Sequence, residues 1–259
     1  MDEDPLGPFL ASPATAGLFL DFDGTLAEIV PLPSDARPLP GVGSLLKRLG
    51  KKFAVVAIVS GRSARQLLDW LGGGVEIWGV HGAERVVGDE VVLVGRAEAY
   101  SELMAQVRAE AEAELAELGV PGTFIEDKTT VFNLHFRTAP NVAEAWHLLG
   151  ALADKLAARH GLTPVEGRHS FELRPPADFS KAAVVLERTR EAGLESVAFV
   201  GDDRVDLPAF DALDALAEED RNTLRVAVRS DEAPPELLAR ADIVVDGPRG
   251  VVEFLERLV

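Results

Sequence analysis

The sequence predicts an α/β protein with a doubly wound parallel-sheet core that is interrupted by an inserted α+β cap domain. Near both ends of the chain, short continuous apolar runs alternate with helical patterns, which is typical of a parallel sheet covered on both faces. In the middle, long helices and alternating strands take over, which indicates an antiparallel sheet with helices. We therefore expect core segments at 1–84 and 175–259 and the cap at 85–174.

Each predicted element has its own signal. In the first core segment, apolar runs predict strands at 17–21, 53–60 and 75–79, and amphipathic patterns predict helices at 42–49 and 63–71. Alternation in the cap predicts a hairpin at 86–94 and strands at 124–137 and 165–173, and Ala/Glu/Leu-rich patterns predict helices at 97–118 and 141–160. The second core segment reads as helices at 180–192, 207–217 and 251–258 and strands at 196–200, 224–228 and 243–245.

Composition excludes several classes of protein. The chain has 259 residues, 47% of them hydrophobic, and no cysteine, so disulfides, thiolate metal sites and a cysteine nucleophile are excluded. No apolar run reaches the roughly 18 residues that span a bilayer, and the acidic start lacks the basic region of a signal peptide. We expect a soluble, cytoplasmic protein that is a monomer.

The net charge limits the possible partners. The formal net charge of −17 argues against nucleic acid or an anionic membrane as a partner. It would also repel an anionic substrate, so a phosphate site in this chain needs local cations or a metal.

The stretch Asp21-Phe22-Asp23-Gly24-Thr25 carries the strongest chemical signal. It follows an apolar run, so it lies at the carboxyl end of a predicted buried strand, where open α/β sheets place ligands. Two carboxylates on a glycine-containing turn suit Mg²⁺, which prefers oxygen ligands, and an aspartate can attack phosphorus. Taken alone, the stretch is equally compatible with a simple Asx turn after a strand.

Three further segments are expected at the same edge of the sheet: Ser60-Gly61-Arg62, Lys181 at a helix start, and Gly201-Asp202-Asp203. Together with the first stretch they supply what phosphoryl transfer needs. Carboxylates hold Mg²⁺ and provide a nucleophile, a hydroxyl and backbone N–H groups hold phosphoryl oxygens, and a cation neutralises developing charge.

This set resembles the haloacid dehalogenase superfamily of phosphatases. The resemblance implies that Asp21 is the nucleophile and Asp23 the general acid–base. It implies phosphate binding by Thr25, Ser60, Gly61 and Lys181, with Lys181 also holding the nucleophile. It further implies Mg²⁺ ligands from Asp21, Asp202 and the backbone carbonyl of Asp23, with Asp203 and Asp206 as supporting acids.

Strand alternation in the cap predicts one polar and one apolar face. Val131, Asn133, His135 and Arg137 share a parity, whereas Phe132, Leu134 and Phe136 take the other. Glu126 and Lys128 share a parity, as do Arg168, Ser170 and Glu172. The apolar face is expected to pack on the two long helices. The polar face is either plainly solvated or binds the hydroxyl groups of a sugar, which need donors and acceptors at fixed positions.

The cap motifs sharpen the resemblance to trehalose-6-phosphate phosphatases. They are Gly79-Val80-His81-Gly82, Glu126-Asp127-Lys128, His135-Phe136-Arg137 and Glu172-Leu173-Arg174-Pro175. The resemblance implies that Glu126, Lys128, Arg137, Arg168 and Glu172 bind the sugar, with Arg62 and His81 between core and cap. The chain departs from the usual family pattern at Val205 and Leu207 and at Ser180 and Ala182, although Ser180 is a good helix N-cap.

The leading hypothesis is Mg²⁺-dependent hydrolysis of trehalose 6-phosphate through an aspartyl-phosphate, a step of trehalose biosynthesis. A phosphatase for another sugar phosphate, such as a glucosyl- or mannosyl-3-phosphoglycerate, stays open because the cap carries several cations. A catalytically inactive sugar-phosphate sensor is the third hypothesis, because the segment 205–207 diverges.

Overall fold

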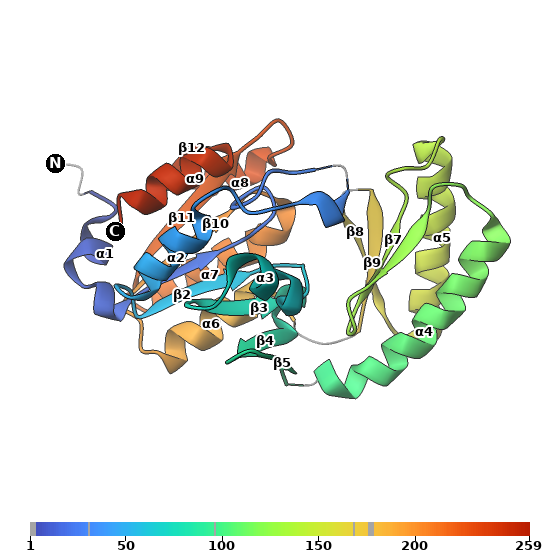
Figure 1. Cartoon of the computed structure of the whole chain (residues 1–259), viewed down its shortest axis with the longest axis horizontal. Helices are drawn as coiled ribbons and strands as arrows, with labels where there is room; N and C mark the ends of the chain where they lie inside the picture. The colour runs from blue at the N-terminus through green and yellow to red at the C-terminus, as the bar shows by residue number, and fades with distance from the viewer. Residues whose placement is uncertain (1–3, 31, 96, 168, 176–178) are drawn as a thin grey trace. The chain divides into compact units, whose positions relative to one another are not determined.

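The computed structural model describes residues 4–30, 32–95, 97–167, 169–175 and 179–259 (Figure 1). Two compact units make up the chain: Met1–Val92 with Phe179–Val259, and Leu93–Asp178. We call the first the core unit and the second the cap unit. The α/β class predicted from the sequence is confirmed.

The core unit is built on an 8-stranded sheet with the order β12-β11-β10-β1-β2-β3-β4-β5. Its central strand β1 pairs in parallel with β2 on one side and with β10 on the other. The chain first builds the sheet from β1 towards β3 and later adds β10 to β12 on the opposite side, so the winding direction reverses beside β1. In doubly wound sheets ligands bind at that point, beyond the carboxyl ends of the strands. The strands are β1 (Ala16–Leu20), β2 (Val55–Val59), β3 (Glu76–Gly79), β4 (Glu84–Val87), β5 (Glu90–Leu93), β10 (Ser196–Gly201), β11 (Asn222–Arg229) and β12 (Ile243–Asp246).

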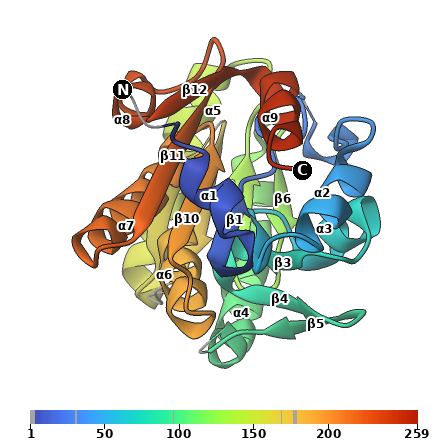
Figure 2. The same cartoon turned by 90° about the vertical axis from the view of Figure 1, so that its left-hand side faces the viewer.

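Helices cover both faces of this sheet, as Figure 2 shows. Leu18 and Leu20 of β1 belong to one hydrophobic cluster with Leu46 of α2 and Phe254 of α9. On the other face, Phe199 of β10 meets Phe210 of α7 with 6.4 Å between ring centroids. Both faces of β1 are thus buried, which explains its continuous apolar sequence. The helices are α1 (Gly7–Ala11), α2 (Val42–Gly50), α3 (Ala64–Leu71), α6 (Lys181–Glu191), α7 (Leu207–Glu218), α8 (Pro235–Arg240) and α9 (Gly247–Glu256).

The hairpin β4–β5 belongs to the core unit, which corrects the expected division at 84 and 174. β4 pairs antiparallel with β3 through Trp78 and Arg85, and the guanidinium of Arg85 lies 4.8 Å from the centre of the Trp78 ring. The buried Glu84 also accepts a hydrogen bond of 2.7 Å from the backbone N–H of Ala64 at the start of α3. These contacts attach the hairpin to the parallel sheet, and the units divide at Val92 and Phe179 instead.

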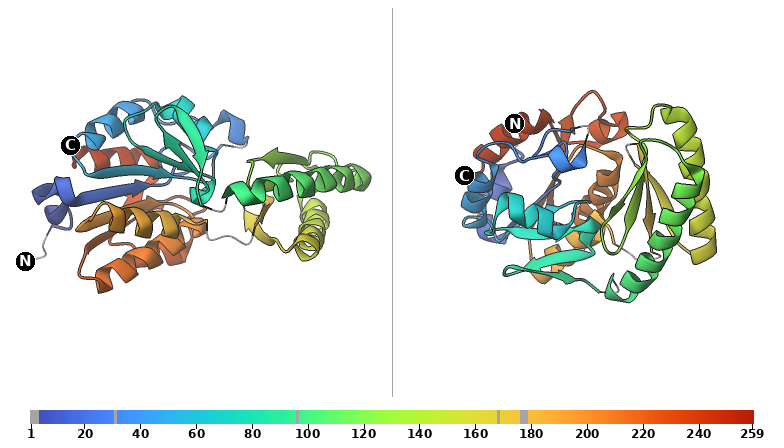
Figure 3. Two further views of the ribbon diagram at one scale, coloured as in Figure 1. Left: turned by 90° about the horizontal axis from the view of Figure 1, so that it is seen from below. Right: turned by 45° about the vertical axis from the view of Figure 1, so that its right-hand side comes forward.

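The cap unit contains a 4-stranded sheet with the order β6-β7-β9-β8, and α4 and α5 pack on one face of it (Figure 3). Leu134 and Phe171 lie opposite each other in the sheet and share a hydrophobic cluster with Val107 of α4 and Leu149 of α5. The expected packing of the apolar face on the two long helices is therefore confirmed. The elements are α4 (Ala97–Leu118), β6 (Phe124–Asp127), β7 (Phe132–His135), α5 (Val142–His160), β8 (Thr163–Gly167) and β9 (Ser170–Arg174).

Two expected cap strands each prove to be a pair of strands. The predicted strand at 124–137 turns back near Thr129, whose φ of 65° lies in the left-handed region, and the one at 165–173 turns near His169, with φ of 57°. Because β7 ends at His135, Arg137 lies in the following turn rather than in the strand. None of the helices within the described ranges has the length and apolar character needed to cross a membrane.

Candidate active site

The carboxyl ends of three neighbouring strands assemble the site in the core unit. Asp21 follows β1, Ser60 follows β2 and Asp202 follows β10. The backbone N–H of Asp21 donates to the carbonyl of Val200 over 2.9 Å, so the strand ladder continues to the first site residue. Since β1 lies between β2 and β10, these three side chains emerge at one edge of the sheet.

Lys181 connects two carboxylates at this edge. Its Nζ atom lies 2.5 Å from Oδ1 of Asp21 and 2.6 Å from Oδ1 of Asp206. Asp206 uses its other oxygen, Oδ2, to accept from the backbone N–H groups of Asp202 and Asp203 over 2.9 and 3.0 Å. With both oxygens bonded, Asp206 holds Lys181 and the loop after β10 in place.

The start of helix α6 positions Lys181. The hydroxyl of Ser180 accepts a hydrogen bond of 3.1 Å from the backbone N–H of Ala183, so the N-cap role expected for this residue is confirmed. Lys181 is the first residue of the helix and is only 2% exposed. The departure at 180 and 182 from the usual family pattern therefore preserves the helix start.

The charges at this edge favour a divalent cation. Within the described part of the chain, the buried carboxylates of Asp21, Asp202 and Asp206 can bring oxygens within 4.8 Å of one another, and one buried ammonium, that of Lys181, lies among them. Two negative charges are therefore left to be balanced, and buried charge is costly unless it is paired. Hard oxygen donors with this excess charge suit Mg²⁺. The residues present fit the ion that the family resemblance implies.

The protonation of this group follows from its burial. Burial raises the pKa of the Asp21 carboxyl to about 7, and the charge of Lys181 opposes the rise. For Lys181, burial would lower the pKa, but the charges of Asp206 and Asp21 outweigh it and hold the pKa above its usual range. Lys181 therefore stays an ammonium.

Gly24 lets the loop after β1 close on Asp202. Its φ is +78°, and a Cβ atom there would lie 2.0 Å from Oδ2 of Asp202. Any side chain at position 24 would displace a predicted metal ligand. The neighbouring Thr25 is fully buried, and its hydroxyl has no hydrogen-bond partner among the residues described. Such a hydroxyl is a donor that a phosphoryl oxygen can satisfy.

Asp23, the expected acid–base, is held by Arg62. Nε and Nη2 of Arg62 donate to Oδ2 and Oδ1 of Asp23, each over 2.7 Å, in a bidentate pair. The side chain of Asp23 is 40% exposed, whereas that of Arg62 is 9% exposed. The backbone N–H of Arg62 also donates to the hydroxyl of Ser60 over 3.2 Å. The structure thus brings these three predicted site residues together.

His81 lies against the backbone of Gly61. A Cβ atom at Gly61 would be 2.8 Å from Cε1 of the imidazole, so only glycine allows this approach. Val80 and His81 adopt φ values of 46° and 57°, which side chains rarely adopt and which are often found at functional sites. The N–H of His81 donates to the carbonyl of Ser60 over 2.9 Å, which fixes the turn.

The predicted polar face of the cap sheet is a hydrogen-bonded cluster. Nζ of Lys128 lies 3.6 Å from Glu126 and 3.7 Å from Glu172. Glu126 also bonds Nε2 of His135 at 3.0 Å and Nδ2 of Asn133 at 3.3 Å. Burial acts against it, but the hydrogen bond from His135 and the charge of Lys128 lower the pKa of Glu126 from 4.5 to about 2.

Some predicted sugar-binding residues are not part of this cluster as described. Arg137 is half-buried in the turn after β7, and Arg168 lies outside the described residues. The sequence reasoning left Arg174 out of the sugar-binding set, although its Nε bonds Glu172 over 2.5 Å. It also overlooked Gln66, whose Oε1 accepts from Nη1 of Arg62 over 3.2 Å. Position 66 lies four residues after Arg62 in an expected helix, which is the only signal the sequence offered.

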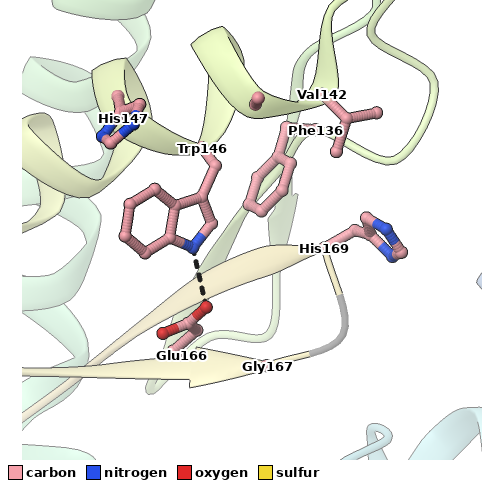
Figure 4. A pocket seen from close by; sticks show the side chains of 8 residues that line it. Phe136, Val142, Trp146, His147, Glu166, Gly167 and His169 are labelled. Atoms are coloured by element: carbon pink, nitrogen blue, oxygen red, sulfur yellow. Dashed lines mark hydrogen bonds between the residues drawn. The ribbon is translucent and has the colours of Figure 1, made fainter.

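A separate hollow of about 530 Å³ lies on the helix side of the cap sheet (Figure 4). Trp146 of α5 is 38% exposed there, and its Nε1–H donates to Glu166 over 2.7 Å. Glu166 is paired with Phe171 in the sheet, so it takes the apolar, helix-facing parity. The hollow is therefore on the opposite face from the Glu126–Glu172 cluster, and Trp146 ties α5 to β8.

Solved structures define the class of fold. The chain matches a haloacid dehalogenase-like hydrolase from Bacteroides thetaiotaomicron with a TM-score of 0.63 at 15% identity, over 94% of this chain and 99% of that one. It matches the C-terminal domain of a trehalose-6-phosphate phosphatase from C. albicans with a TM-score of 0.77 at 22% identity, over 100% and 97% of the two chains. The architecture is that of haloacid dehalogenase-like hydrolases.

Sequence comparison then identifies the family. The model of the trehalose-phosphatase family matches residues 19–237. A trehalose-phosphate phosphatase from Mycobacterium leprae is 33% identical over 253 residues, which is 93% of this chain and 57% of that protein. The corresponding protein from Mycobacterium avium is 33% identical over 93% of this chain and 61% of its own length. The chain belongs to the trehalose-phosphatase family and spans about three fifths of these curated relatives.

Proposed function

We propose that this chain is a Mg²⁺-dependent phosphatase that hydrolyses trehalose 6-phosphate to trehalose and phosphate. The observation that carries the proposal is the buried group of Asp21, Lys181 and Asp206 beside Asp202. A sheet edge with a held carboxylate, a buried ammonium and excess negative charge suits phosphoryl transfer. Membership of the family supports the choice of substrate.

In the first step, an Asp21 oxygen attacks phosphorus and forms the aspartyl-phosphate, while the bond from phosphorus to the sugar oxygen breaks. Asp23 gives its proton to the leaving alkoxide. In the second step, Asp23 takes a proton from water, whose oxygen attacks phosphorus and releases phosphate and the free Asp21 carboxylate. Lys181 holds Asp21 in line throughout, because its ammonium is bonded to Oδ1.

Asp21, Asp202 and the backbone carbonyl of Asp23 would hold Mg²⁺. When bound, the ion neutralises charge on the phosphoryl group. It would also favour the ionised, nucleophilic form of Asp21, whose pKa burial raises to about 7.

Phosphate contacts are proposed for Thr25, Ser60, the backbone of Gly61, and Lys181. Sugar contacts are proposed for the cluster of Glu126, Lys128 and Glu172 and for four further residues: Arg62, His81, Arg137 and Arg168. Asp203 supports the loop after β10, since its Oδ1 accepts from the N–H of Arg204 over 2.7 Å.

The charges of the cap cluster favour a neutral sugar over a phosphoglycerate. Lys128 already lies between Glu126 and Glu172, and Glu172 is also bonded by Arg174. A substrate carboxylate would have to compete with these protein carboxylates, whereas hydroxyl groups can bond both donors and acceptors. The monomeric state and the cytoplasmic location expected from the sequence stay predictions.

Phosphate release tests the proposal. Trehalose 6-phosphate, glucose 6-phosphate and glucosyl-3-phosphoglycerate are each incubated with the protein in Mg²⁺ and in EDTA. We expect turnover confined to trehalose 6-phosphate and abolished by EDTA. Turnover of another sugar phosphate alone would overturn the substrate assignment, and binding of trehalose 6-phosphate without turnover would support a sensor. Asp21→Asn is the control and should be inactive while keeping the wild-type circular dichroism spectrum.

A further inference from the structure

The ion pair of Asp23 and Arg62 is held by a third residue, Trp70. The guanidinium carbon of Arg62 lies 4.9 Å from the centre of the Trp70 ring and 5.8 Å from that of Phe22. The two rings are themselves stacked with centroids 5.5 Å apart. Arginine is a long, flexible side chain, and packing on aromatic rings limits the rotamers that it can adopt.

Helix α3 supplies this support from one face. Ser63 caps the helix, and Gln66 and Trp70 are four residues apart, so they lie on the same side. Arg62 directly precedes the cap, and its guanidinium contacts both: Nη1 donates to Gln66 over 3.2 Å, and the group lies against Trp70. The two nitrogens that bond Asp23 are Nε and Nη2. The plane of the guanidinium is therefore set by α3, and that plane sets the orientation of the carboxylate.

We propose that Trp70 is a positioning residue that, through Arg62, fixes the carboxylate of Asp23 at the site. The inference rests on the proposed function, in which Asp23 transfers the proton. Trp70 acts on the reaction through Arg62. Its loss should leave phosphate and sugar contacts in place but let Asp23 move, and proton transfer depends strongly on that geometry.

The choice of leaving group separates this role from a general structural one. A sugar alkoxide needs a proton from Asp23 as it leaves, whereas p-nitrophenolate is stable without one. Mispositioned Asp23 should therefore slow transfer from trehalose 6-phosphate but not the initial burst of p-nitrophenolate. General damage to the site would slow both equally.

The test compares Trp70→Met, Trp70→Leu and the conservative Trp70→Phe with wild type. We expect kcat for trehalose 6-phosphate to fall about tenfold in Trp70→Met and Trp70→Leu, with KM within about twofold. Trp70→Phe, which keeps an aromatic face, should retain kcat within about threefold. The burst of p-nitrophenolate should keep its wild-type rate within about twofold in all three.

Two variants serve as matched controls. Trp146→Leu removes an exposed tryptophan of the cap unit. Arg37→Met removes a second cation that lies 5.2 Å from the Trp70 ring but does not bond Asp23 in any contact described above. Both should keep the wild-type kcat. Equal losses for both substrates in Trp70→Leu, or a wild-type kcat in Trp70→Met and Trp70→Leu, would overturn the inference.

A measurement without turnover distinguishes this inference from the proposed function. In ¹H–¹⁵N spectra, the Nε–H signal of Arg62, assigned by its loss in Arg62→Lys, should exchange slowly with solvent in wild type. It should exchange fast in Trp70→Met and stay slow in Trp70→Phe and Trp146→Leu. A slow signal in Trp70→Met would overturn the inference. If wild type fails to hydrolyse trehalose 6-phosphate, the proposed function falls and the spectra still decide whether Trp70 holds the pair.

Discussion

At the scale of single residues, Lys181 is the cation that allows Asp21 and Asp206 to be buried together. Breaking such a buried pair leaves a charge without a partner, which typically costs about 3 to 5 kcal/mol. Lys181 has a carboxylate 2.5 Å away on one side and 2.6 Å away on the other. The single ammonium thus links the end of β1, the start of α6 and the turn after β10.

Glu126 gives the cap unit a stability that depends on pH. Its pKa is about 2 in the folded chain against an ordinary 4.5, so its stabilising contribution is complete above about pH 5 and is lost as the pH falls towards 2. Because 31% of the side chain is exposed, solvent reduces the contribution. We expect Glu126→Gln to lower the free energy of unfolding by about 1 to 3 kcal/mol at pH 7.

Urea unfolding at pH 7 and pH 3 checks this expectation. The difference between wild type and Glu126→Gln should shrink to less than half at pH 3. The exposed Glu117 provides the control, and Glu117→Gln should change little at either pH. A difference that is the same at both pH values would show that the Glu126 charge does not stabilise the cluster.

At the scale of elements, the close approach of the loop after β1 to Asp202 depends on Gly24. Gly24→Ala places a methyl group where Asp202 Oδ2 lies, 2.0 Å away, and we expect it to abolish stabilisation of the fold by Mg²⁺. Gly41→Ala is a matched control, since Gly41 has a similar φ of +89° with nothing within 4 Å of the added Cβ. Both variants carry the same backbone strain, typically about 1 kcal/mol or more.

Thermal melts with Mg²⁺ and with EDTA separate the two effects. Both variants should melt below wild type in EDTA, and only Gly41→Ala should be stabilised by Mg²⁺ as wild type is. If Mg²⁺ stabilises Gly24→Ala as strongly as wild type, then Asp202 is not a ligand of the ion.

The elements also show what the sequence can predict. The parallel strands and the long helix Ala97–Leu118 were predicted well, because continuous apolar runs and helical periodicity are local signals. The hairpin β4–β5 was assigned to the wrong unit, because its place depends on Glu84 reaching the N–H of Ala64 twenty residues earlier in the chain. Likewise the turn at Thr129 was missed, since neither glycine nor proline marks it.

At the scale of the whole molecule, the site could be predicted in composition but not in connection. Asp21, Asp23, Lys181 and Asp202 followed from motifs at the ends of expected strands. The central place of Asp206 and the support of Arg62 by Trp70 depend on side-chain contacts between α3, α6 and the loop after β10, which no local pattern encodes. Each unit has its own hydrophobic cluster, so the overall division could be predicted from the change in pattern along the chain.

The net charge of −17 takes on a local meaning in the folded chain. An anionic substrate meets an acidic protein, and the unbalanced carboxylates of Asp21, Asp202 and Asp206 would repel it without a cation. The account therefore requires that metal and nucleophile work at the same place.

Rapid-quench labelling tests the central claim most directly. The protein is mixed with Mg²⁺ and trehalose 6-phosphate that carries ³²P, quenched in acid within milliseconds, and digested. The account predicts a label on the peptide that contains Asp21, released by hydroxylamine as expected for an acyl phosphate, and no label in Asp21→Asn. Turnover by wild type without any labelled peptide, or a label that persists in Asp21→Asn, would contradict it.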